Sequence, residues 1–232
     1  MKMNSLSQEV RARRLKAFVA PDSIISLRAY NTILTGVVMY GLLINVLLCR
    51  ESVVNFVFTK MNPIMFFVIY FVCAAGGIML AQKSSNALIS FIGYNMVVVP
   101  MGIAVAVAVL MGGFDPSVVS HAIITTAGVT VIMVAAGILF PQFFARIGSI
   151  LFFGLVGVLV GFLVSIFLPG VHLAMTVLSA GLFSLYIGYD VYRSQQFPRT
   201  VDNAVDCAID IYLDIINLFL DLLRIFGNSK KN

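Results

Sequence analysis

One stretch near the end of the chain, residues 204–226, constrains the fold more than any other. It reads AVDCAIDIYLDIINLFLDLLRIF, which is apolar enough for a bilayer. Its polar side chains recur every three or four residues: Asp206, Asp210, Asp214, Asn217, Asp221 and Arg224. At about 100° per residue, a helix places all of them in one stripe about 80° wide. Because a carboxylate at membrane depth costs roughly 2.5–3.5 kcal/mol, this stripe must face protein or water.

The composition of the whole chain indicates a membrane protein. Its 232 residues are 60% hydrophobic and 11% charged, whereas soluble domains have about 25% charged residues. Further long apolar runs precede the acidic stretch, at 30–48, 63–81, 87–111, 121–140, 147–168 and 171–189. The sequence therefore predicts an all-α polytopic membrane protein with seven transmembrane helices.

The loop charges predict the domain organisation and the orientation. Residues 1–28 form a basic cytoplasmic N-terminal segment, 29–227 the seven-helix transmembrane domain, and 228–232 a short basic tail. With the N-terminus inside, most of the basic residues lie on the inner side, as the positive-inside rule requires. The basic tail alone favours an inner C-terminus, as in a re-entrant last helix, but 204–226 is long enough for a full crossing. The formal charge of +5 is explained by orientation, so no nucleic-acid partner is expected.

The remaining reactive side chains do not form a catalytic pattern. Cys49, Cys73 and Cys207 are expected to be reduced, buried thiols without a disulfide framework. His121 and His172 are isolated, without a Glu or Cys at zinc-ligand spacing, and are expected to be exposed in loops. The pair Tyr189-Asp190 is similar to one motif of intramembrane aspartyl proteases, but their second motif is absent. An enzyme is therefore not expected, nor a cofactor.

Asp190 and Asp214 are the candidate functional residues. Asp190 lies at the inner end of 171–189 and Asp214 midway along the acidic stretch. Two carboxylates brought close in a poorly solvated site share a proton, and when ionised they offer the hard oxygen ligands that Ca²⁺ prefers. The alternative is a structural polar lock without an ion. Asp206 and Asp221, nearer the helix ends, are expected to face solvent; Asp210 lies between these cases.

Lys83 is the only basic residue between 63–81 and 87–111, on the same predicted inner side as Asp190. The sequence leaves two roles open for Lys83. One is a positive-inside anchor; the other is a cationic latch that pairs with Asp190 or Asp214.

Two motifs resemble a known family. The first segment is Phe183-Ser184-Leu185-Tyr186-Ile187-Gly188-Tyr189-Asp190, and the second is Ile211-Tyr212-Leu213-Asp214-Ile215-Ile216-Asn217-Leu218-Phe219-Leu220. Together they are similar to the Bax inhibitor-1 family in its bacterial form. The ending Leu222-Leu223-Arg224-Ile225-Phe226-Gly227 is similar as well. The close resemblance covers about the last fifty residues, and the motif positions Tyr189, Tyr212, Asn217 and Arg224 belong to it.

The resemblance implies a fold and an activity. The fold is a seven-helix bundle with the last helix central, and the activity is a pH-sensitive calcium leak gated by the aspartates that match Asp190 and Asp214. Lys83 is the best match for a basic residue that partners them in bacterial relatives. The chain departs from the family where Val191-Tyr192 replaces Thr-Gln. It also departs at Asp206, Asp210 and Asp221, where relatives carry apolar or small neutral residues.

Two functions follow from this resemblance. The first is a calcium leak channel in which Asp190, Asp210 and Asp214 line the ion path, with calcium as the transported or regulatory ion. The second is a non-conducting regulator that binds a partner such as a membrane protease. Short loops and the absence of appended domains favour a bacterial inner membrane, with a cytoplasmic N-terminus.

Overall fold

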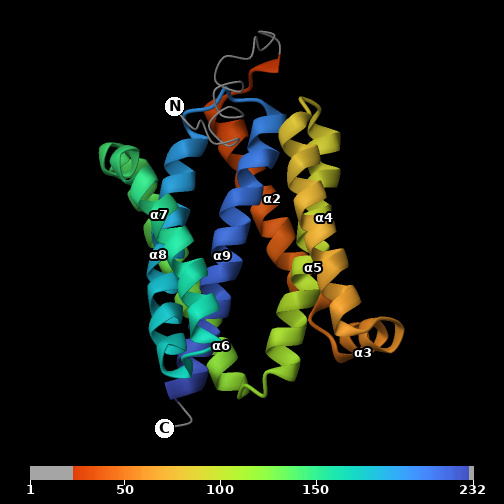
Figure 1. Cartoon of the computed structure of the whole chain (residues 1–232). Coiled ribbons are helices and arrows are strands. Elements are labelled where there is room, and N and C mark those ends of the chain that lie inside the picture. The colour runs from red at the N-terminus through yellow and green to blue at the C-terminus, as the bar shows by residue number, and fades with distance from the viewer. Residues whose placement is uncertain (1–22, 230–232) are drawn as a thin grey trace, which may run out of the picture. The chain divides into compact units, whose positions relative to one another are not determined.

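The computed structural model describes residues 23–229, and within them the chain is helical without strands (Figure 1). In chain order the helices are α2 (Leu27–Leu48), α3 (Glu51–Lys60), α4 (Pro63–Lys83), α5 (Ala87–Met111), α6 (Pro116–Leu139), α7 (Pro141–Ser165), the short 3₁₀ helix η2 (Pro169–Val171), α8 (His172–Ser194) and α9 (Val201–Ser229). The predicted all-α class is confirmed. Most of the predicted N-terminal segment 1–28, and the tail residues 230–232, lie outside the described residues.

Six of these helices are long and apolar enough to cross a membrane: α2, α4, α5, α6, α7 and α8. Large apolar side chains on them stand exposed, among them Phe71 (64%), Ile132 (66%) and Phe153 (71%). Such surfaces require lipid around them. The seventh long helix, α9, has 29 residues and is about 43 Å long at 1.5 Å per residue. Its length suits a crossing, but its charges set it apart from the other six.

The structure corrects several predicted boundaries. The segment after α2, expected to be a loop, contains α3, whose Val54 and Val57 are buried. α6 and α7 begin at Pro116 and Pro141, earlier than predicted, because proline suits the first turn of a helix. Asp115 also caps α6, since its side chain accepts a hydrogen bond from the Ser117 amide at 2.8 Å.

The helices group into two compact units. The first holds residues 23–48, 52–103 and 193–209. In it, α4 and α5 approach closely at Gly77 and Gly93. A Cβ atom on Gly93 would lie 2.5 Å from the Gly77 carbonyl oxygen, and one on Gly77 would meet the Gly93 carbonyl. Small residues at a crossing permit this backbone contact between membrane helices.

The second unit holds residues 49–51, 104–192 and 210–229. Here α6 and α8 meet at Gly137 and Gly188, since a Cβ atom on Gly137 would collide with the Gly188 carbonyl. α8 also contacts α7, where a Cβ atom on Gly148 would lie 2.7 Å from the Tyr189 hydroxyl. Both contacts fix the part of α8 that carries Asp190.

We expect Gly137→Ala to destabilise the protein, because its methyl group must push α6 away from α8. The cost of such overpacking is about 1–3 kcal/mol. Gly128→Ala is the matched control on the same helix, because a Cβ atom there meets nothing within 4 Å. Thermal unfolding in detergent should show a lower midpoint for Gly137→Ala only; equal midpoints would contradict the close α6–α8 contact.

Candidate functional site

Three of the six side chains in the polar stripe of α9 are buried, two are half-buried, and Arg224 is exposed. Asp206, Asp214 and Asp221 are 4%, 7% and 3% exposed, while Asp210 and Asn217 are half-buried. The expectation that Asp206 and Asp221 face solvent is therefore wrong. Position near a helix end did not decide their exposure, because the helix continues beyond them on both sides, from Val201 to Ser229. The apolar residues of α9 are buried as well, including Ile209, Tyr212, Leu218 and Leu223.

Asp190 and Asp214 both belong to the second unit, and each is only 7% exposed. Asp190 lies on α8 between the buried residues Ile187 and Val191. Tyr212, fully buried, precedes Asp214 on α9. Two carboxyl groups in the interior of one unit are costly to ionise without a cation or donors nearby.

A row of aromatic rings accompanies Asp190 along α8. Tyr189 lies 6.4 Å from Tyr186 and 6.3 Å from Tyr192 between ring centroids. The hydroxyl end of Tyr189 packs against Gly148 of α7. These contacts fix the rotation of α8 about its axis, and with it the direction of the neighbouring carboxyl group.

Lys83 is the last residue of α4 and is exposed. It belongs to the first unit. An exposed lysine in the last turn of a helix interacts favourably with the helix dipole and suits the anchoring role. Its role as a latch on the aspartates stays a prediction.

The first unit contains a polar network that the sequence did not indicate. It holds the linker between α8 and α9 against α2. Tyr30, fully buried, donates its hydroxyl hydrogen bond to the Ser194 carbonyl at 3.0 Å. Nearby, the Gln195 amide donates to Asn31 Oδ1 at 3.1 Å, and the Ile25 amide donates to the Arg199 carbonyl at 2.8 Å.

A second contact of the first unit fixes the start of α9. The Ser90 hydroxyl on α5 donates to Asp202 Oδ1 at 2.7 Å. Asp202 also lies in the first turn of α9, where its negative charge is favourable to the helix dipole. Nothing in the local sequence marks Ser90 or Tyr30, since each partner lies more than one hundred residues away.

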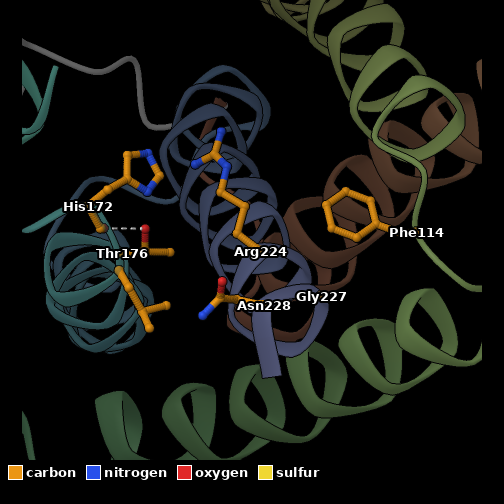
Figure 2. Close-up of a pocket in the computed structure, with 7 residues that line it drawn as sticks. Phe114, His172, Thr176, Arg224, Gly227 and Asn228 are labelled. Carbon is orange, nitrogen blue, oxygen red and sulfur yellow. Dashed lines mark hydrogen bonds between the residues drawn. The ribbon is translucent and has the colours of Figure 1, made fainter. Parts of the chain in front are cut away.

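A pocket lined by both polar and apolar side chains lies in the second unit, and the sequence did not indicate it either. Its volume is about 320 Å³. Figure 2 shows its lining residues, which come from the α5–α6 turn, the start of α8 and the end of α9: Phe114, His172, Leu173, Thr176, Arg224, Gly227 and Asn228. His172 is exposed as predicted, but it begins α8 instead of lying in a loop. The Phe114 ring packs against Gly227, where a Cβ atom would collide with it.

Within residues 23–229, no group of three or more His, Cys, Asp or Glu side chains is arranged to hold a metal ion. A stable Ca²⁺ site needs six to eight oxygen ligands. Any cation at Asp190 or Asp214 would therefore keep part of its water shell.

Comparison with known proteins gives one family and several bacterial relatives. The family model described as "Inhibitor of apoptosis-promoting Bax1" matches residues 24–231. An uncharacterized protein of Helicobacter pylori (strain ATCC 700392 / 26695) is 38% identical over 86 residues, which is 36% of each chain. One from Deinococcus radiodurans is 27% identical over 164 residues, covering 66% of this chain and 68% of its own. Inner membrane protein YbhL of Escherichia coli (strain K12) is 29% identical over 123 residues, covering 48% of this chain and 53% of YbhL. The matches to the Helicobacter protein and to YbhL thus cover about a third and about half of those relatives.

Proposed function

This chain belongs to the Bax inhibitor-like family of membrane proteins, and from that premise we propose that it is a pH-sensitive calcium leak channel. The observation that carries the proposal is the burial of Asp190 and Asp214, each 7% exposed, within one unit. One relative is named an inner membrane protein; we place this chain likewise in a bacterial inner membrane, with its N-terminus in the cytoplasm.

The spacing of oxygen ligands on α9 supports passage of a cation. Asp210, Asp214, Asn217 and Asp221 follow one another at intervals of three or four residues, which is about 4.5–6 Å along the helix axis. Conduction requires several weak sites in series, so that an ion enters and also leaves. A row of single carboxylates and one amide meets this requirement.

Protonation gives the proposed channel its pH response. When Asp190 and Asp214 are ionised, they attract Ca²⁺ or the ammonium group of Lys83. When they hold a proton, the attraction for both partners falls. Weaker pairing with Lys83 favours opening, whereas weaker attraction for Ca²⁺ slows entry. Flux should therefore vary with pH and pass through a maximum.

Calcium flux into liposomes tests the proposal. Purified protein is reconstituted with an entrapped calcium dye, and the initial rate is measured from about pH 5 to pH 8, against protein-free liposomes. We expect a protein-dependent rate that changes with pH. Correctly folded protein that gives no flux at any pH would contradict the channel and favour the regulator of a membrane protease.

Asp210 should contribute to the path, because it lies one turn before Asp214 on the same stripe of α9. We expect Asp210→Ala to lower the calcium rate several-fold, or to change the ratio of calcium to sodium flux, while the protein still inserts and folds. Glu51→Ala removes an exposed acid at the start of α3 and serves as the control. Unchanged flux and selectivity in Asp210→Ala would show that Asp210 does not contribute to the cation path.

A further inference from the structure

The pocket at the start of α8 and the end of α9 has an exposed rim and a buried floor. His172, Arg224 and Asn228 are exposed, whereas Thr176 is fully buried and Gly227 is buried. Figure 2 shows His172 and Thr176 on α8 facing Arg224 and Asn228 on α9. The His172 ring packs edge-on against Phe162, with 5.6 Å between ring centroids. The pocket therefore has polar side chains at its rim and is open to the outside of the unit.

A buried carboxyl group lies one helical turn below this rim. Asp221 precedes Arg224 by three residues, and its Oδ1 lies 3.4 Å from Arg224 Nη1. Its Oδ2 is buried without a hydrogen-bond partner in the described part of the chain. The Ser179 hydroxyl, one turn below Thr176 on α8, faces the same carboxyl group. A buried carboxyl oxygen without a hydrogen-bond partner in the described residues thus lies beside the Asp221–Arg224 pair.

The pocket lies at the opposite end of the helices from Asp190. His172 and Asp190 stand at the two ends of α8, 18 residues apart, which is about 27 Å at 1.5 Å per residue. This length is close to the roughly 30 Å of the hydrocarbon core. Asp221 lies two turns beyond Asp214 on α9, with Asn217 between them. The row of ligands on α9 therefore leads from Asp214 to the pocket.

From these observations we propose that the pocket is the mouth of the cation path on the side away from Asp190, and that Arg224 closes it by pairing with Asp221. The inference rests on the proposed channel function. The Arg224 side chain is 48% exposed, so its long, flexible stem leaves room for the guanidinium group to turn outward. Asp221 is then left facing the pocket and receives a hydrated cation. One carboxylate is too few ligands to retain Ca²⁺, so the ion passes on.

Calcium flux in liposomes tests the role of Arg224. Arg224→Gln removes the closing charge and should raise the rate several-fold, while Asp221→Asn should lower it. The double variant should behave as Asp221→Asn, because an open mouth without its carboxylate has no cation site. Arg224→Lys keeps the charge and should stay near the wild-type rate. Arg146→Gln on α7 is the control, since Arg146 is exposed and outside this pocket. If Arg224→Gln folds and leaves the rate unchanged or lowers it, the closing role is wrong.

Thiol labelling tests the mouth without relying on conduction. In a protein without its native cysteines, Ser179→Cys should react slowly with a charged methanethiosulfonate reagent, and at least several-fold faster when Arg224→Gln is added. Equal rates would overturn the closing role even if the wild-type protein conducts calcium. If Arg224→Gln speeds labelling but the protein conducts no calcium, Arg224 still controls access to the pocket, and the proposed channel function is wrong.

A third variant does not depend on the stability of Arg224→Gln. Asn228→Cys places a thiol on the exposed rim, and a bulky maleimide attached there should reduce flux by more than half. Ser120→Cys, exposed in the first turns of α6 and outside the pocket, should label without loss of flux. Full flux through protein labelled at residue 228 would show that ions do not enter by this pocket.

Discussion

Asp190→Asn and Asp214→Asn should each abolish most of the pH response of calcium flux, and the double variant should be little worse than either single one. Each substitution removes a titrating charge at nearly constant shape. If both carboxyl groups titrate as one unit, loss of either leaves no coupled pair, so the effects of the two substitutions do not add. Liposome flux across about pH 5 to pH 8 measures this.

Two controls separate gating from a structural role. Glu51→Gln neutralises an exposed acid and should keep the wild-type pH profile. Thermal unfolding of the Asn variants shows whether the bundle is intact. A single Asn variant that keeps the wild-type pH profile would show that the aspartates do not gate. A stability loss without any change in profile would identify them as a polar lock.

The class of fold was predictable from sequence because membrane helices need long apolar runs. Those runs and the length of the acidic segment were enough to place α2 and α4 to α9, with errors mainly at helix starts. The short helix α3 was missed, since ten residues with a few charges have no clear period. The starts of α6 and α7 were missed because Pro116 and Pro141 begin these helices several residues before the apolar runs predicted at 121–140 and 147–168.

The candidate site was predictable only in part. The stripe of aspartates follows from helical spacing alone, and burial of Asp190 and Asp214 follows from the cost of carboxylates in lipid. The same cost applies to Asp206 and Asp221, but they were predicted to face solvent because they lie near the ends of the predicted helix. The pocket at Arg224 depends on which turn of α8 faces which turn of α9, as Ser179 and Asp221 show. Sequence spacing within one helix does not contain that information.

The path proposed for cations requires α9 to cross the membrane, and this gives the second large expected effect. Ser26→Cys before α2 and Asn228→Cys at the end of α9 are both exposed positions. In intact cells or oriented vesicles, an impermeant maleimide should label them from opposite sides, with Ser26→Cys on the cytoplasmic side. Two of the three native thiols are poor competitors: Cys207 is buried, and burial raises the pKa of Cys49, which lowers its thiolate fraction. Cys73, which is half-buried, is replaced by Ser before labelling.

The length of α9 is the physical reason to expect opposite sides. Its 29 residues span about 43 Å, against a hydrocarbon core of roughly 30 Å. The buried aspartates of α9 face protein, so a crossing does not place them in lipid. The positive tail at Lys230 and Lys231 opposes an outer C-terminus. Labelling of both positions from the cytoplasmic side would show that the positive charge of the tail keeps the C-terminus inside and that α9 is a re-entrant helix. The pocket at Arg224 would then open on the same side as the N-terminus, and a cation following α9 from Asp214 to Asp221 would not cross the membrane.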